Sequence, residues 1–167
     1  MPFPSFDESY REALGQADSL EAIGRVVKVA ARHLTGAQGA TFVLAQDGYC
    51  FYADEDAIGP LWKGQRFAMD HCISGWAMMH GAHAVVPDIT SDSRIPQTAY
   101  APTFVRSLAM VPVGVPAVAA IGAYWATEHD ATHTEVRALT RLADATAAAI
   151  ERVGLDEAPW APNFSLT

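Results

Sequence analysis

The chain has 167 residues, of which half are hydrophobic and 18% are charged, and this is the composition of a folded domain with a substantial core. Its formal net charge is −8 at pH 7, and no cluster of lysines and arginines offsets that charge. A surface of this sign repels nucleic-acid phosphates and anionic lipids. We therefore expect one domain with extensions, and neither nucleic acid nor a membrane as its partner.

The two cysteines of the chain, Cys50 and Cys72, fit neither a disulfide framework nor a zinc site in number and spacing. The N-terminus is acidic and lacks the apolar core of a signal peptide. The longest apolar stretch is interrupted by Pro112, Gly114 and Pro116, so we expect no segment to span a membrane. These features favour a reducing cytoplasm as the location.

The first expected elements are helices. A short helix is expected near residues 7–16. A second helix is expected over residues 18–34, because Asp18 and Glu21 have the spacing of an N-terminal cap and apolar residues then recur at helical spacing. Gly36 is expected to end it.

The period then changes to that of strands. Residues 40–53 hold two β-rich runs joined by Asp47 and Gly48, a strong hairpin signal. Cys50 lies in the second run, where burial as a small hydrophobic residue explains it. Three further elements are expected before residue 88: a strand over 64–70, a helix over 73–80 that ends at Gly81, and a strand over 82–88.

A long polar segment follows over residues 88–106, with a possible helical turn near 95–99. It exceeds the usual connection of about 4–6 residues, and such segments are typical of binding loops and lids. Two strands, 107–113 and 118–126, come next and are apolar on both faces, so we expect both faces of their sheet to be covered. Helices would cover one face, and the long polar segment is the candidate for the other.

The last helix is expected over residues 132–153, opened by a capping box from Thr132 to Glu135. Residues 154–167 contain two prolines and no period, and we interpret them as a tail or linker. Helices at the two ends of the chain with strands between them predict an α+β sandwich around one antiparallel sheet.

Four segments together resemble a GAF domain, particularly those of bacterial sensor histidine kinases and related signalling proteins. They read "CISGWAMMHG", "VVPDI", "DSRIP" with the following "PTFVRSLAMVPV", and "AIGAYWA". The resemblance covers roughly residues 15–153. It implies a six-stranded antiparallel sheet with the terminal helices on one face and a loop-covered small-molecule pocket on the other. Segment 88–106 would then be the lid. We accordingly divide the chain into an N-terminal extension or short helix (1–17), the GAF domain (18–153) and the tail (154–167).

Ten residues are candidates for the pocket and lid because they lie on or beside the resembling segments and carry polar, thiol or aromatic groups. They are His71, Cys72, Trp76, Asp88, Asp92, Arg94, Tyr100, Arg106, Ser107 and Tyr124. The arginines have the chemistry to bind an anion through paired hydrogen bonds. Alternatively, they pair with the loop aspartates and simply order the lid. Tyr124 and Trp125 are adjacent on a strand, so only one of them can face the pocket.

GAF domains differ in what they bind, and several chemistries fit this chain poorly. Free methionine-(R)-sulfoxide reductases need an attacking and a resolving thiol, and we expect Cys72 to lack a partner thiol because Cys50 is on the hairpin. Bilin-binding relatives carry a cysteine followed by a histidine, whereas here His71 precedes Cys72. No metal-ligand pattern and no cyclic-nucleotide signature of the phosphodiesterase type is found.

We therefore expect a non-catalytic cytoplasmic sensor or regulatory domain in signal transduction that binds an unidentified small molecule and no cofactor or metal. A reductase and a purely structural dimerisation module are the alternatives. A histidine kinase or other signalling protein is a possible output partner. We also expect a homodimer through a heptad stripe on the last helix: Val136, Leu139, Ala143, Thr146, Ile150 and Val153.

Overall fold

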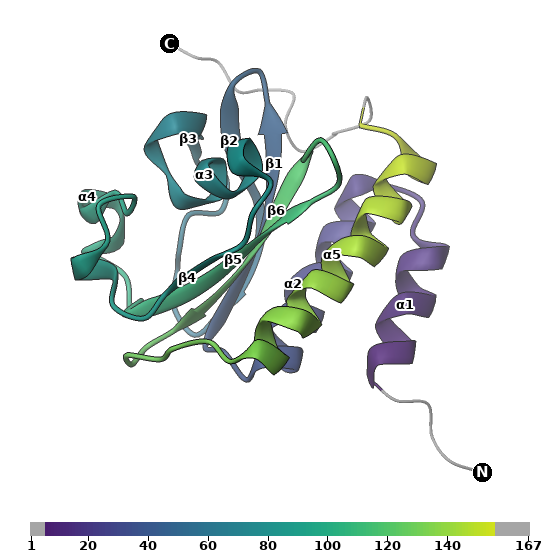
Figure 1. The fold of residues 1–167 in the computed structure, drawn as a ribbon. Helices are drawn as coiled ribbons and strands as arrows, with labels where there is room; N and C mark the ends of the chain where they lie inside the picture. Colours follow the sequence, from purple (N-terminus) through teal and green to yellow (C-terminus); the bar gives the residue numbers. More distant parts are fainter. Residues whose placement is uncertain (1–5, 156–167) are drawn as a thin grey trace.

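The computed structural model describes residues 6–155 and shows three layers (Figure 1). Helices α2 (Leu20–Thr35) and α5 (His133–Val153) cover one face of a sheet, and α1 (Phe6–Gln16) packs against these two helices. The shorter helices α3 (Ile73–His80) and α4 (Gln97–Tyr100) lie on the other side, with the 3-10 turns η1 (Met69–His71) and η2 (Ile89–Ser91). The predicted tail, residues 154–167, lies outside the described part except for Gly154 and Leu155.

The sheet has six strands in the order β3-β2-β1-β6-β5-β4, and every neighbouring pair is antiparallel. This confirms the predicted α+β class and the six-stranded sheet. The strands are β1 (Gly39–Gln46), β2 (Tyr49–Ala57), β3 (Arg66–Ala68), β4 (Ala84–Val86), β5 (Ser107–Val113) and β6 (Ala119–Trp125).

Both faces of the sheet are buried, as the doubly apolar strands predicted. On β6, Ile121 and Trp125 pack toward the terminal helices, while Ala120 and Tyr124 pack toward the opposite layer. Adjacent residues on a strand point to opposite faces. Tyr124 is therefore the member of the Tyr124–Trp125 pair that faces the predicted pocket.

Local signals explain most element ends. The hairpin between β1 and β2 turns at Asp47 (φ 52°) and Gly48 (φ 82°), two consecutive left-handed residues that match the twist of the flanking strands. Helix α5 begins with the predicted capping box of Thr132 and Glu135. The cap of α2 differs from the prediction, because Ser19, not Asp18, accepts the hydrogen bond from the Ala22 amide at 3.0 Å.

The heptad stripe on α5 is part of the monomer core. Leu139, Ala143, Thr146 and Ile150 are at most 3% exposed and pack in the layer between the helices and the sheet, while Val136 and Val153 at its ends are half-buried. The stripe therefore contacts α2 and the sheet within one chain, which corrects its assignment as a dimer surface. None of the helices in residues 6–155 is long and apolar enough to cross a membrane.

Candidate functional site

Four aromatic residues meet on the sheet face that the terminal helices leave uncovered. We call Tyr52, Trp62, Tyr100 and Tyr124 the aromatic cluster. The Trp62 ring lies at its centre, with ring centroids 5.5 Å from Tyr52, 4.5 Å from Tyr100 and 5.4 Å from Tyr124. All four side chains are buried, and they come from β2, the 58–65 loop, α4 and β6.

The position of Trp62 depends on one carboxylate. Glu55 on β2 accepts hydrogen bonds from the backbone amides of Leu61, Trp62 and Lys63 at 2.8–2.9 Å. The indole nitrogen of Trp62 donates to the Ala99 carbonyl at 2.9 Å, which links the loop to α4. The loop is thus held against the lid by directed hydrogen bonds as well as by apolar contact.

The hydroxyl groups of the aromatic cluster point into a buried polar core. The Tyr124 hydroxyl bonds to the Thr41 hydroxyl at 2.9 Å, and the Tyr52 hydroxyl bonds to Ser74 at 3.0 Å. The Tyr100 hydroxyl faces that of Tyr124 but finds no partner with hydrogen-bond geometry among the described residues. Burial raises the pKa of all three tyrosines, so each remains a neutral phenol.

Glycine makes room for this packing on β6. A Cβ atom on Gly122 would lie 2.5 Å from the Tyr124 hydroxyl oxygen and 2.9 Å from the Met110 Cε atom. The ring of Tyr124 therefore folds back over Gly122 along its own strand. Any larger residue there would displace the ring from the cluster.

The two cysteines also meet beneath this face, which the sequence did not suggest. The thiols of Cys50 on β2 and Cys72 at the start of α3 interact with each other, and Cys72 Sγ lies 3.3 Å from Ser74 Oγ. Cys50 is fully buried, as predicted, and Cys72 is 5% exposed. The expectation that Cys72 lacks a partner thiol is therefore wrong, because the β2–β3 pairing returns the chain to Cys50 just before Cys72.

The two thiols have opposite acidities. The hydrogen bond from Cys50 lowers the pKa of Cys72 to about 6, helped by Ser74, the Gly75 amide and the nearby charge of His71, while burial opposes the shift. The same hydrogen bond, together with burial, raises the pKa of Cys50. Cys72 is thus the thiolate of the pair, and Cys50 keeps its proton.

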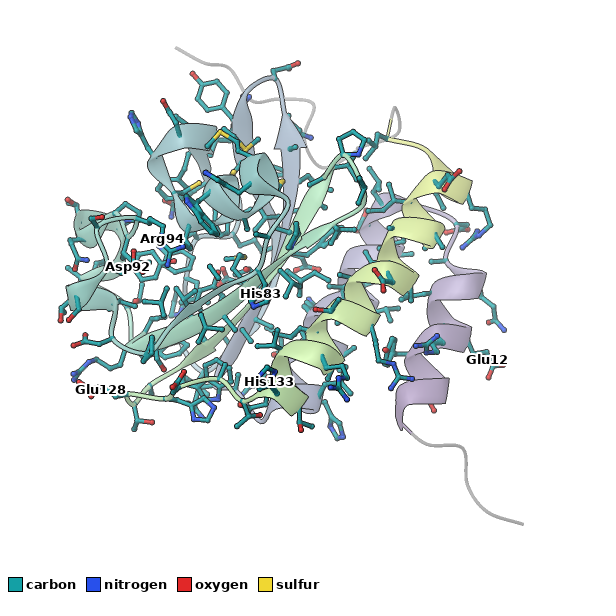
Figure 2. All side chains as sticks on the ribbon, in the orientation of Figure 1. Glu12, His83, Asp92, Arg94, Glu128 and His133 are labelled. Atoms are coloured by element: carbon teal, nitrogen blue, oxygen red, sulfur yellow. The ribbon has the colours of Figure 1, made fainter. Side chains whose placement is uncertain are left out.

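The lid is held by an ion pair between Arg94 and Asp92, which agrees with the alternative that the loop arginines pair with loop aspartates. Arg94 donates to Asp92 through two nitrogens, at 2.6 and 2.9 Å, and both residues are labelled in Figure 2. The guanidinium carbon of Arg94 lies 4.3 Å from the centroid of the Trp76 ring. The arginine lowers the pKa of Asp92. We call Trp76, Asp92 and Arg94 the latch, because they join α3 to the lid across the outside of the site.

The other predicted lid charges act elsewhere. Asp88 accepts hydrogen bonds from Thr90 and Ser91 inside its own turn, and Arg106 pairs with exposed Glu128 at 3.3 Å. Both were predicted to pair across the lid, and neither bonds to the latch.

Two further candidates lie outside the site. The His71 side chain is 77% exposed and lies 3.7 Å from Asp70, so it faces solvent. Ser107 is buried, and its hydroxyl bonds to the Thr127 carbonyl at 2.7 Å, where it secures the start of β5. At these positions, neither residue contacts the aromatic cluster.

Of the ten predicted residues, six belong to the site. Cys72, Tyr100 and Tyr124 lie in its interior, and Trp76, Asp92 and Arg94 form the latch. Sequence reasoning missed Thr41, Tyr52, Trp62 and Ser74. Tyr52 had a usable signal, since it lies two residues from Cys50 on the same face of β2; Trp62 had none, because it lies in a loop without a period.

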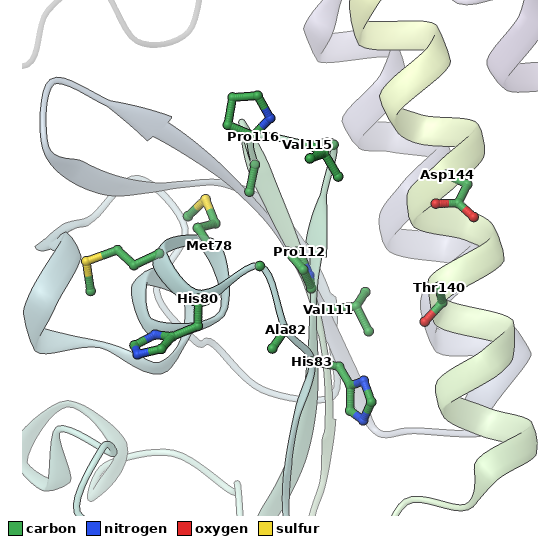
Figure 3. A pocket seen from close by; sticks show the side chains of 14 residues that line it. Met78, His80, Ala82, His83, Val111, Pro112, Val115, Pro116, Thr140 and Asp144 are labelled. Atoms are coloured by element: carbon green, nitrogen blue, oxygen red, sulfur yellow. The ribbon is translucent and has the colours of Figure 1, made fainter.

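A separate hollow of about 530 Å³ opens between the end of α3, the β5–β6 hairpin and α5 (Figure 3). His80, His83, Thr140 and Asp144 lie on its rim, and Pro112 and Val115 on its wall. It does not reach the aromatic cluster. No group of three or more possible metal-ligating residues occurs in residues 6–155.

The comparisons with known proteins agree with this architecture. The sequence profile described as "GAF domain" matches residues 16–151, so the chain belongs to the GAF domain family. These domains generally act as ligand-binding sensor or regulatory modules. A search of curated protein sequences found no match.

Solved structures show the same fold at low sequence identity. The GAF domain of a Coxiella burnetii phosphoenolpyruvate-protein phosphotransferase aligns with a TM-score of 0.77 at 14% identity, over 87% of this chain and 90% of that chain. The GAF domain of a Bacillus halodurans two-component sensor histidine kinase gives 0.69 at 18%, over 82% and 97%. Free methionine-R-sulfoxide reductase from Neisseria meningitidis, solved with its substrate, gives 0.64 at 21%, over 92% and 95%.

Proposed function

We propose that this GAF domain is a non-catalytic sensor that binds a small molecule between the sheet and the 88–106 lid. The observation that carries the proposal is the buried Tyr100 hydroxyl, which lies near that of Tyr124 but has no partner with hydrogen-bond geometry in the described part of the chain. An unsatisfied buried polar group costs about 1–3 kcal/mol. A ligand that supplies the missing hydrogen bond would recover this free energy.

The surroundings define the class of ligand. The interior offers neutral hydroxyls and aromatic rings, and its three phenols stay protonated. The one latch arginine is already paired with Asp92 and lies outside the cluster. A compact, uncharged molecule with a flat apolar body and one or two polar groups fits these walls best.

Signal transmission would follow from a change in the lid population. The aromatic cluster fills its own face in the closed conformation, so a ligand has to bind a conformation in which Tyr100 and α4 have moved. A ligand that prefers one lid position shifts the equilibrium between the two. Tyr124 shares β6 with Trp125, whose ring packs under the terminal helices, and this strand is a direct connection between the two faces. In our proposal these helices form a homodimer and pass the change to an output partner such as a cytoplasmic histidine kinase.

Native mass spectrometry of freshly purified protein tests the proposal. We expect a retained compound on the wild-type chain, and less of it on Arg94→Ala, which loses the latch. Arg106→Ala is the matched control, because its removal breaks only the exposed pair with Glu128. A chain that carries no compound, and whose melting temperature responds to no member of a neutral metabolite library, would contradict ligand sensing.

A reductase remains the second candidate because the thiol pair supplies the partner that sequence reasoning had missed. Against it, Cys72 is 5% exposed and Cys50 is fully buried, so a substrate the size of an amino acid does not reach the sulfur in the closed conformation. A thiol-dependent assay with free methionine sulfoxide separates the two. We expect no turnover, and turnover that disappears in Cys72→Ser would establish the enzyme.

A further inference from the structure

The strongest feature that ligand sensing leaves unexplained is the pair of buried thiols. Burial as small hydrophobic residues accounts for one cysteine in a core, but not for two that share a hydrogen bond and a hydroxyl. Cys72 Sγ lies 3.3 Å from Ser74 Oγ and 3.6 Å from the Ala68 carbonyl oxygen, and Cys50 Sγ lies 3.6 Å from Met69 Sδ. Residues 68, 69 and 74 thus surround one small polar site with both sulfurs in it.

Two separate elements place the sulfurs together. Antiparallel pairing sets Cys50 on β2 opposite Phe67 on β3, and η1 then turns the chain so that Cys72 begins α3. Gly75 allows this close approach, because a Cβ there would lie 1.7 Å from the Met69 carbonyl oxygen.

We propose that Cys50 and Cys72 form a reversible intramolecular disulfide, which makes this domain a peroxide-responsive redox switch. Cys72 is the attacking sulfur and Cys50 is the resolving sulfur. The oxidant is a small hydroperoxide such as hydrogen peroxide, which is compact enough to reach a cysteine residue that is 5% exposed. The disulfide can form whether or not the small-molecule ligand proposed above is bound.

The chemistry proceeds in two balanced steps. The Cys72 thiolate attacks one oxygen of hydrogen peroxide, the O–O bond breaks, and the departing hydroxide takes a proton from solvent, leaving a sulfenic acid and one water. Cys50 then attacks the Cys72 sulfur, the S–O bond breaks, and the departing hydroxide takes the Cys50 proton to form a second water. The two thiols lose two electrons and the peroxide gains them. A small dithiol reverses the change by thiol–disulfide exchange.

The disulfide would change the ligand site through one contact. Ser74 bonds both to Cys72 and to the Tyr52 hydroxyl of the aromatic cluster. Once Cys72 turns toward Cys50 and becomes a disulfide sulfur, it no longer offers Ser74 a thiolate acceptor. A change in the oxidation state of the two cysteines therefore alters the hydrogen bonds of the hydroxyl groups around Tyr52.

Peptide mapping of the intact chain tests the proposal. The reduced protein is treated with hydrogen peroxide, its remaining thiols are blocked, and it is digested without reductant. We expect a cross-linked peptide containing Cys50 and Cys72, loss of both free thiols, and recovery of both with dithiothreitol. Thiols that stay free, or disulfides that join two chains instead, would overturn the proposal.

Two variants test the assigned roles. Cys50→Ser should stop at the sulfenic acid, which is trapped by dimedone and shows the added oxygen in the intact mass. Cys72→Ser should leave Cys50 reduced at the same peroxide dose. The opposite pattern, with Cys50 forming the sulfenic acid, would reverse the assignment. The wild-type peptide map is independent of how well either variant folds.

Discussion

Single hydroxyl groups determine much of the free energy of unfolding at the site. Thr41 is fully buried, and its hydroxyl partners that of Tyr124 at 2.9 Å. Thr41→Val keeps the shape but leaves the phenol unpaired, so we expect a loss of about 1–3 kcal/mol. Adding Tyr124→Phe removes the stranded group and should recover part of that loss. Urea denaturation of the single and double variants measures both effects.

Exposed Thr140 on α5 provides the control, because Thr140→Val makes the same chemical change at the surface and should stay within about 0.5 kcal/mol of wild type. If Thr41→Val were equally neutral, the Thr41–Tyr124 bond would not stabilise the fold.

The acidity of Cys72 gives a prediction for pH. Because its pKa is lowered to about 6, its thiolate fraction and its reaction rate with peroxide should be high at neutral pH and fall as the pH drops through that value. Removing the hydrogen bond from Cys50 with Cys50→Ala should move the midpoint upward. The ultraviolet absorbance of the thiolate, followed against pH, measures the midpoint in both proteins.

Cys50 makes the largest contribution to the lowered pKa of Cys72, and the other groups near the thiolate contribute less. Ser74 and the Gly75 amide are uncharged at all relevant pH values, and Tyr52, Tyr100 and Tyr124 remain neutral because burial raises their pKa. His71 is the remaining charged contributor and is largely exposed. A midpoint that follows His71→Ala but not Cys50→Ala would contradict the assigned cause.

At the scale of elements, the latch should control the lid. Arg94→Ala removes both the pair with Asp92 and the contact with Trp76, so hydrogen exchange and proteolysis should increase over residues 88–106 while the strands stay protected. Arg106→Ala, the control, should change little because its partner Glu128 is exposed. Equal protection in wild type and Arg94→Ala would show that apolar contacts alone close the lid.

The latch should also open in acid. The pKa of Asp92 lies below its usual value of 3.8, so the pair stabilises the closed lid above that value, and this contribution is lost as the pH falls through the lowered pKa. Hydrogen exchange of segment 88–106 at decreasing pH should show this loss in wild type but not in Arg94→Ala. A parallel pH response in both proteins would rule out Asp92 as its origin.

The periodicity of apolar residues made the elements and their buried faces predictable. The contacts between elements could not be predicted in this way. The alternation of side chains along β6 was enough to predict that Tyr124 and Trp125 lie on opposite faces of the sheet. The meeting of Cys50 with Cys72 depends on the β2–β3 register and on η1, neither of which has a sequence signal strong enough to read. Arg106 was assigned to the wrong partner for a similar reason, since Glu128 lies beyond β6 and reaches it only through the sheet.

At the scale of the whole molecule, the α5 stripe shows that a heptad spacing does not distinguish a partner helix from a packed core. Leu139 and Ile150 face α2 and the sheet, and the same 3,4 spacing serves that purpose. Ile150→Glu should therefore destabilise the monomer by at least the about 2–5 kcal/mol typical of truncating such a side chain. Thermal unfolding measures this effect. An unchanged melting temperature would show that the stripe lies on the surface of the monomer.

A homodimer through the terminal helices remains a prediction, and it now requires a different surface. The outer side of α1 and α5 forms a hollow of about 410 Å³ whose lining includes the small residues Gly15, Ala145 and Ala148, so a second helix pair can approach closely there. Arg152 is already engaged with the Leu14 and Ala17 carbonyls and helps to hold α1 in place.

Ala148 is exposed, and Ala148→Glu should abolish a dimer without lowering the melting temperature. Thr134→Glu adds the same charge at the opposite end of α5 and should leave the dimer intact. Sedimentation at micromolar concentration measures all three proteins: a monomeric wild type would contradict the dimer, and a dimeric Ala148→Glu would contradict this surface.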